Sequence, residues 1–496
     1  MRASLSDNKR PPLLDSILSG VARRYRVPAR PALSQSHQDN NAASTLAIAI
    51  EEARTALARK EAPDKTVKHR FLESLARIIL DAMRTEEGDP AFQAMVLQHQ
   101  TAHVREYASL AAHADKDRRT VRSAVNAVAH PAKQGLASSR RQAEALAQLH
   151  ELASSSSWKE LAEKARHAVE LTDIADDPSL ARGIARVRDE AALERLQRLK
   201  DLEPDELVQR YLSLRDRNGP RSGSTDAAAQ GSASRRRGAE VEALAAQAIQ
   251  ALALRLDRAE GSTGSYRVAT SLRVPASIPG NAERAKSEWD VVLLRKAEEN
   301  SDGVDKEGER SKDSGEDREN RGDEGNSKAD SAWDVLLLVE AKASVDAATT
   351  DLPRLLRGLR LLSHADGDTA YSFEAKQGTI RLRGASLCAV NPDEAGSQGN
   401  DKLRKTVLYF CDAPAEATPR ILSSATRMQL LSAPASLAFA GKQALGQDAG
   451  PQDLEPVWQA LLESPRWFAV LHQYQALHQV RELMVHADDL MAAIQQ

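Results

Sequence analysis

One apolar run in the sequence ends on two charged residues with a regular spacing. The run LLLVEAK carries Glu340 and Lys342, which are two residues apart. Residues two apart on a β-strand leave the same face of the sheet, so a carboxylate and an ammonium would lie side by side there. Charges at the end of a buried strand need an opposite charge, a cation or a cleft. This pair is therefore the first candidate for chemistry.

A second acidic residue, Asp290, opens the earlier apolar run DVVLL. If the two runs pair as antiparallel strands, the start of the first lies beside the end of the second, so Asp290 would meet Glu340. Two carboxylates there could hold Mg²⁺ or Mn²⁺, with a backbone carbonyl and water completing the coordination. Asp334 has a similar local sequence, but it precedes Glu340 by about 20 Å of extended strand and is expected only to begin that strand.

The elements that must position these residues follow from the apolar pattern. A helix is predicted to run from about residue 238 to 258 because one broad face is apolar. Downstream of it we predict strands at 266–274, 289–295 and 333–342, a helix at 351–363, and strands at 386–390 and 406–411.

The segment between the second and third strands, at about 297–330, is charged and polar. Residues 295–330 hold 8 Lys/Arg and 13 Asp/Glu, a net charge of −5, and almost no large apolar side chains. Such a composition cannot bury a core, so we expect a disordered insertion at the tip of a hairpin.

This order of elements, with an Asp on the second strand and Glu-x-Lys on the third, resembles the PD-(D/E)xK nuclease superfamily, the fold of many restriction endonucleases and repair nucleases. The resemblance covers residues 238–415, although the literal Pro of the motif is absent before Asp290. It implies a restriction-endonuclease-like α/β core with a mixed sheet.

The same resemblance implies roles for individual residues. Asp290 and Glu340 would bind Mg²⁺ or Mn²⁺, and Lys342 would orient or activate the attacking water and stabilise charge on the phosphate. The family often adds an acidic residue from the first helix. Glu242 is the candidate for that role, with Glu240 close behind, because helix phase does not separate them.

Helical patterns flank this core on both sides. We expect a flexible N-terminus with a short amphipathic segment at 1–41, a helical domain at 42–216, a Gly- and Ser-rich linker at 217–237 and a helical C-terminal segment at 416–496. The fold class is thus mixed, with helical regions before and after the α/β core.

The composition describes a protein with several structural units and an aliphatic core. The chain has 496 residues, of which 41% are hydrophobic and only 4% aromatic. Cys388 and Cys411 lie in apolar runs without zinc-site spacing and are expected to be buried free thiols in strands. No run is long and apolar enough to span a bilayer, so we expect no membrane partner and a cytoplasmic location.

The sequence therefore favours a metal-dependent nuclease that hydrolyses phosphodiester bonds, with DNA as the expected substrate. The net charge of −3 differs from the strongly positive charge that is typical of nucleic-acid-binding domains. The alternative is a catalytically silent protein of the same fold that binds nucleic acid or acts as an interaction scaffold. The helical region could bind a protein partner or self-associate.

Overall fold

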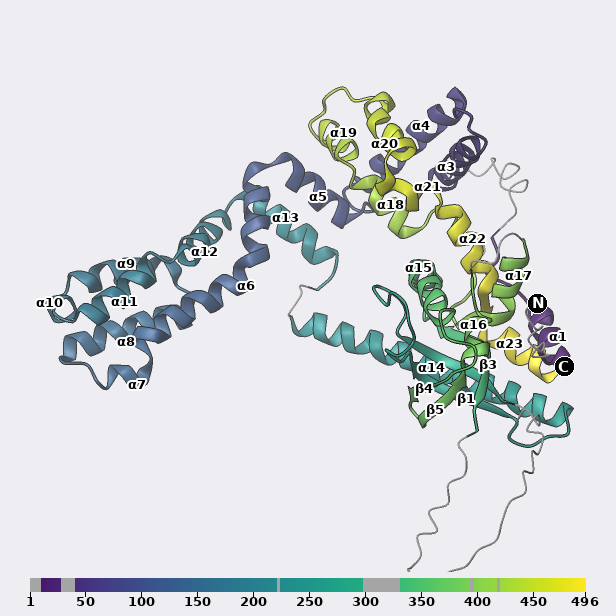
Figure 1. Cartoon of the computed structure of the whole chain (residues 1–496). Coiled ribbons are helices and arrows are strands. Elements are labelled where there is room, and N and C mark those ends of the chain that lie inside the picture. The colour runs from purple at the N-terminus through teal and green to yellow at the C-terminus, as the bar shows by residue number, and fades with distance from the viewer. Residues whose placement is uncertain (1–9, 28–40, 221–223, 298–330, 393–396, 417–419) are drawn as a thin grey trace, which may run out of the picture. The chain divides into compact units, whose positions relative to one another are not determined.

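A computed structural model describes most of the chain, and its contacts divide the chain into two units (Figure 1). The first unit comprises Met1–Phe71, Ala228–Arg427 and Ala460–Gln496, and the second comprises Leu72–Ala227 and Met428–Gln459. The described residues are 10–27, 41–220, 224–297, 331–392, 397–416 and 420–496. The expected insertion at about 297–330 lies outside them apart from its first residue.

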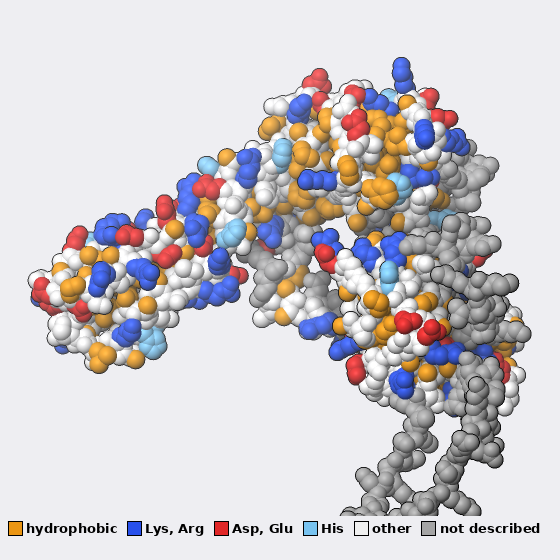
Figure 2. Space-filling view, viewed as in Figure 1, with side chains coloured by type: hydrophobic (Ala, Val, Ile, Leu, Met, Phe, Trp, Pro, Cys, Tyr) orange, Lys and Arg blue, Asp and Glu red, His pale blue; other side chains and the backbone are white. Residues whose placement is uncertain are grey.

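The second unit is a helical array whose helix starts follow from capping residues. Asp89, Asp177 and Asp205 each accept hydrogen bonds from backbone N–H groups of the following first turn. Acidic and basic side chains are interspersed over the face of this unit seen in Figure 2. Its helices are α5 (Pro90–Gln100), α6 (Ala102–Ala129), α7 (Pro131–Gln134), α8 (Arg140–Ser154), α9 (Trp158–Glu170), α10 (Thr172–Ala175), α11 (Pro178–Arg188), α12 (Ala191–Leu202), α13 (Glu206–Arg217) and α19 (Pro434–Ala444).

The boundaries of this unit differ from the expected helical domain at 42–216. Helix α3 (Ala42–Ala58) belongs to the first unit, where it packs against α21 (Phe468–Leu471). In exchange, α19 of the expected C-terminal segment packs against α5, and a side chain at Gly441 would collide with Gln100. These pairings join residues hundreds of positions apart, so local patterns could not reveal them.

The first unit contains a mixed sheet. Its strands are β1 (Tyr266–Arg273), β2 (Glu288–Lys296), β3 (Trp333–Ala341), β4 (Ala370–Ala375), β5 (Gly378–Arg383), β6 (Val407–Cys411) and β7 (Met484–His486). Their order is β2-β1-β4-β5-β3-β6-β7, and β2 also pairs with β3, so five strands close into a ring that β6 and β7 extend. The β1, β2 and β3 pairings are antiparallel, whereas β6 is parallel to both β3 and β7.

Helices cover both faces of this sheet. The helices are α1 (Pro12–Gly20), α14 (Thr225–Ala259), α15 (Val345–Leu362), α16 (Gly384–Cys388), α17 (Ser397–Thr406), α22 (Gln473–Leu483) and α23 (Ala487–Gln495). On one face α14, α1 and α23 bury a cluster with Val291, Leu337 and Val339. On the other, α15 and α22 bury a cluster with Val292 and Leu338. The expected mixed sheet flanked by helices is therefore present.

Each boundary between the units falls within a described helix. The helices are α4 (Lys65–Ala82), α14, α18 (Ser424–Leu431) and α20 (Glu455–Glu463).

The linker expected at 217–237 is shorter in the structure. Residues from Thr225 onward of the expected linker belong to α14, because Ala, Gln and Arg in this stretch favour helix despite the Gly and Ser residues among them. The short amphipathic segment expected within residues 1–41 corresponds to α1: its Leu14 and Ile17 are buried, and α1 lies beside α23 (Figure 1).

The region after α15 also differs from expectation. Residues 384–388 form α16 rather than part of a strand at 386–390, because a short apolar run fits a buried helix as well as a strand. Cys388 is accordingly helical and only partly buried, while Cys411 is a buried free thiol in β6 as expected. The β4–β5 hairpin and the three-residue strand β7 were not predicted.

Candidate active site

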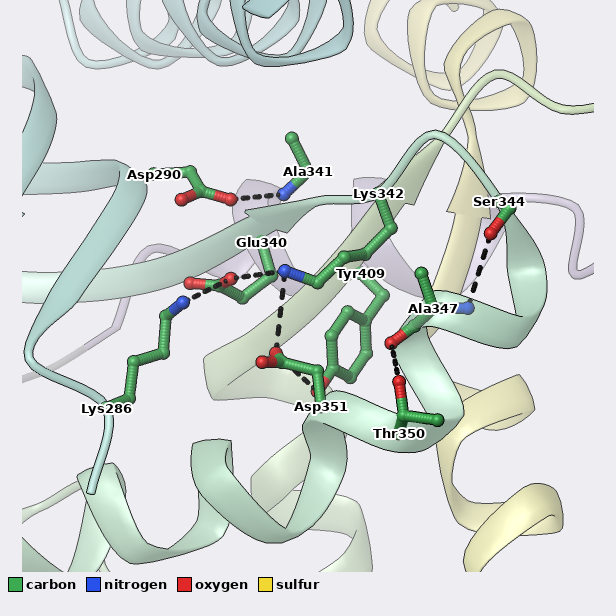
Figure 3. Close-up of polar contacts among 10 residues, drawn as sticks. All are labelled: Lys286, Asp290, Glu340, Ala341, Lys342, Ser344, Ala347, Thr350, Asp351 and Tyr409. Atoms are coloured by element: carbon green, nitrogen blue, oxygen red, sulfur yellow. Dashed lines mark hydrogen bonds and ion pairs between the residues drawn. The ribbon is translucent and has the colours of Figure 1, made fainter. Parts of the chain in front are cut away.

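The antiparallel pairing of β2 and β3 brings Asp290 beside Glu340, as the sequence predicts. Val291 pairs with Val339, so the residue before the first lies next to the residue after the second. The Ala341 N–H donates a hydrogen bond to Asp290 Oδ2 at 2.9 Å, which holds the carboxylate against the end of β3 (Figure 3). This contact leaves the other oxygen of Asp290 available for a ligand.

Glu340 is fully buried and carries an asymmetric set of partners. Two ammonium groups contact the same carboxylate oxygen, Oε2: Lys286 Nζ at 2.6 Å and Lys342 Nζ at 3.1 Å (Figure 3). The other oxygen, Oε1, is buried and has no hydrogen-bond partner. A buried carboxylate oxygen without a protein partner costs free energy, so Oε1 is a position where a water molecule or a cation would bind favourably.

The pKa of Glu340 is raised from 4.5 to about 7. Desolvation by burial is the largest cause, and the neighbouring charge of Asp290 adds to it. The ammonium groups of Lys286 and Lys342 act in the opposite direction and limit the increase. A carboxyl group tuned in this way is typical of functional sites.

Lys342 lies between two carboxylates. Its ammonium is also 3.5 Å from Asp351 Oδ2, and the Tyr409 hydroxyl donates to that same Asp351 oxygen at 3.3 Å. Burial alone would lower the pKa of Lys342, but the charges of Glu340 and Asp351 outweigh burial and the pKa is raised. Lys342 is therefore a cation and a hydrogen-bond donor at neutral pH.

Three residues around Glu340 were missed by sequence reasoning. Lys286 lies on the segment before β2, Asp351 lies in α15, and Tyr409 is the partner of Glu340 in the parallel β3–β6 pairing. The strand period predicts that Tyr409 shares a face with Glu340 once that register is known. No local pattern marks Lys286 or Asp351.

The two glutamates on α14 have different surroundings. Glu240 lies 4.0 Å from both Arg236 and Arg237. The pKa of Glu242 is raised by partial burial and then by the charge of Asp290, which places Glu242 close to the candidate site. The electrostatic influence of Asp290 on Glu242 is consistent with the role expected for this residue, which stays a prediction.

Asp334 lies at the opposite end of β3, apart from Glu340. Its buried carboxylate forms a two-point ion pair with Arg383, with Arg383 Nε donating at 2.6 Å. This contact ties the start of β3 to the end of β5. Asp334 is therefore a structural residue at a strand start, as expected.

The carboxylates of the site fit a divalent ion only if water or substrate supplies its remaining ligands. Within the described ranges, no three His, Cys, Asp or Glu side chains form a group that could hold a metal ion. Asp290 and Glu340 Oε1 nevertheless offer hard oxygen atoms. Mg²⁺ is commonly bound by one or two carboxylates together with water and substrate phosphates, so these two residues would suffice.

Two further findings bear on the classes of function. In the part of the chain that the structure describes, every helix is too short or too polar to cross a membrane. Comparison of the chain with protein-family models, with curated proteins and with solved structures gave no match.

Proposed function

We propose that the protein is a metal-dependent nuclease whose active site consists of Asp290, Glu340 and Lys342, with Glu242 at its edge. The observation that carries this proposal is the partnerless Oε1 atom of the buried Glu340 beside the Asp290 carboxylate. A divalent cation is the ligand that would relieve both the repulsion between the two carboxylates and the missing interaction at Oε1.

The order and pairing of the elements support the same proposal. A helix, α14, precedes three antiparallel strands with Asp on the second and Glu-x-Lys on the third. Helix α15 and the parallel strand β6 follow. This is the order of the PD-(D/E)xK superfamily, with the β4–β5 hairpin and helices α16 and α17 as additions between α15 and β6. We infer a restriction-endonuclease-like core and DNA as the substrate.

Each site residue has a role that its surroundings favour. A bound Mg²⁺ or Mn²⁺ would lower the pKa of water and screen the phosphate oxygens. Asp290 and Glu340 would orient that ion, because the Ala341 N–H and the lysines fix their carboxylates. Lys342 remains protonated, so it would hydrogen-bond the attacking water and stabilise negative charge on the phosphate rather than accept a proton.

Cleavage of labelled DNA tests this proposal. Linear and circular, single- and double-stranded substrates are incubated with Mg²⁺ or Mn²⁺ and with the parent protein, Lys342→Ala or Lys296→Ala. Lys296 is an exposed lysine at the far end of β2, so its variant is the matched control. We expect metal-dependent cleavage by the parent and the control and none by Lys342→Ala. A Lys342→Ala protein that cleaves at the parent rate contradicts the mechanism.

A catalytically silent scaffold is the second candidate. The observation that favours it is that Lys286 and Lys342 already neutralise Glu340 without a metal. Calorimetric titration separates the two: the nuclease proposal expects Mn²⁺ binding that Asp290→Asn weakens, whereas a scaffold of this kind needs no Mn²⁺ site. Under either candidate, we propose the helical unit as the region that contacts a protein partner or a second copy.

A further inference from the structure

Lys286 is a buried lysine outside the Glu-x-Lys motif. Its side chain is 6% exposed, and its ammonium lies 2.6 Å from Glu340 Oε2, closer than that of Lys342 at 3.1 Å. The ammonium also lies 5.8 Å from the centre of the Trp289 ring, within range of a cation–π interaction. Lysine is almost never fully buried unless its charge is paired, so this placement requires a specific reason.

The surrounding backbone is shaped to hold Lys286 in place. Helix α15 approaches it at Gly358, where an added Cβ would lie 2.7 Å from Lys286 Cβ and 3.3 Å from its backbone. Arg357 Nε donates a hydrogen bond to the Arg284 carbonyl at 2.9 Å, which ties the segment to the same helix. Arg284 itself has φ of +56°, a conformation unusual for a residue with a side chain. The position of Lys286 is thus fixed from two sides.

The two oxygen atoms of the Glu340 carboxylate differ in their contacts with the two lysines. Both ammonium groups lie on Oε2, and none lies on Oε1. A carboxylate held in this way offers one oxygen to a metal ion and cannot bind it through both. The direction of the free oxygen is then set by the lysines.

The charges of the site also favour a single divalent ion. When all of them are ionised, the four carboxylates and two ammonium groups carry a net charge of −2, which one divalent cation neutralises. Without Lys286 the sum would be −3, and a second ion would be attracted more strongly. The groups counted are Glu242, Asp290, Glu340, Asp351, Lys286 and Lys342.

We propose that Lys286 is a positioning residue of the active site: it holds Glu340 Oε2, so that Glu340 binds one divalent ion through Oε1 alone. The expected effect of Lys286 on catalysis rests on the proposed nuclease function. The expected effect on metal binding does not. Lys286 acts through Glu340 and is not assigned a contact with the substrate.

The experiment compares the full-length parent with Lys286→Met, Lys286→Gln and the exposed control Lys296→Met. Mn²⁺ binding is measured by calorimetry at pH 8.5, above the pKa of Glu340 of about 7. DNA cleavage is measured at saturating Mn²⁺, and folding is checked by circular dichroism. If Lys286→Met does not fold, Lys286→Gln, which keeps a hydrogen-bond donor but not the charge, carries the test.

We expect the parent and the control to bind one Mn²⁺ per chain. Lys286→Met should bind Mn²⁺ at least about tenfold more tightly, because a competing cation has been removed from Oε2. Its turnover should nevertheless fall about a hundredfold, since a misplaced ion or carboxylate slows the reaction. Lys286→Gln should retain more turnover than Lys286→Met. A lysine that serves only folding would weaken both properties together.

Several outcomes overturn the inference. They are two Mn²⁺ ions in the parent, weaker Mn²⁺ binding by a folded Lys286 variant, or, where the parent cleaves DNA, unchanged cleavage by Lys286→Met. If the parent binds one Mn²⁺ and Lys286→Met binds it more tightly, but neither protein cleaves any substrate, the role of Lys286 in metal binding stands and the nuclease proposal fails.

Discussion

The two ends of strand β3 both carry a buried carboxylate, but the two carboxylates are satisfied differently. Arg383 contacts both oxygens of Asp334 at one end. At the other end, two lysines share one oxygen of Glu340 and leave the second without a partner. Both residues are at most 1% exposed, so burial does not distinguish them. The difference lies in hydrogen bonding: both oxygens of Asp334 have protein partners, whereas Glu340 Oε1 has none and leaves room for a water molecule or a cation.

Removing a metal ligand at the Glu340 end should give the largest effect. Asp290→Asn should lower the cleavage rate at least about 1,000-fold, because the divalent ion loses one of two protein carboxylates. The amide oxygen can still accept the Ala341 N–H and the repulsion with Glu340 is removed, so the midpoint of urea unfolding should not fall. Single-turnover cleavage and urea unfolding measure the two properties. Cleavage by Asp290→Asn at the parent rate would show that this end of β3 is as inert as the other.

The pH dependence of stability should further distinguish the Glu340 end of β3 from the Asp334 end. The pKa of Glu340 is higher in the folded protein, at about 7, than its ordinary value of 4.5. Its contribution to stability is therefore fully present below pH 4.5 and is lost as pH rises through about 7. The loss should approach about 3 kcal/mol in the presence of a chelator, at 1.36 kcal/mol per pKa unit.

Urea unfolding between pH 4.5 and 8, with chelator or with Mn²⁺, measures this loss. Mn²⁺ should reduce it above pH 7, because the ion binds the ionised carboxylate. Glu340→Gln should remove the dependence in this window. If the stability of the parent does not fall over this range without metal, Glu340 is not the strained group that its contacts indicate.

Breaking the ion pair at the Asp334 end should affect stability and leave chemistry intact. Asp334→Ala should lower the free energy of unfolding by about 2 kcal/mol, less than the loss for a fully buried pair, because the Arg383 side chain is 32% exposed. The cleavage rate per folded molecule should remain within about twofold of the parent. Thermal unfolding and a cleavage assay at low temperature measure the two effects. If Asp334→Ala loses most of its cleavage without losing stability, Asp334 is not the structural residue that its contacts indicate.

The sequence predicts those site residues whose positions follow from the two-residue period of a strand and from the order of the strands. The spacing of Glu340 and Lys342 and the antiparallel order of their strand and the Asp290 strand were sufficient to bring these residues together. Lys286 and Asp351 were not predictable in the same way. Their contacts with Glu340 and Lys342 depend on how a loop and a helix pack against the sheet, and no local pattern encodes that packing.

In the fold, too, local sequence patterns predict single strands, whereas contacts between distant segments are not predicted. The first three strands and β6 were located within a few residues, because their apolar runs are bounded by charged or small residues. The unit boundaries were not, since each unit combines segments from distant parts of the chain. Gly441 illustrates the reason: a Cβ added there would meet the side chain of Gln100, far earlier in the chain, and no local pattern reveals that contact.

The late position of β7 has a consequence for synthesis of the protein. Strand β6, with all five residues buried, gains its outer partner only when Met484–His486 has been made. Helix α1 likewise waits for α23, which ends at Gln495. Until the segment with β7 and α23 has been made, the apolar edge of the sheet at β6 and the buried face of α1 lack these partners. Uncovered edges and apolar faces of this kind favour aggregation, so β6 and α1 are exposed to it during synthesis for longer than the strands that pair early.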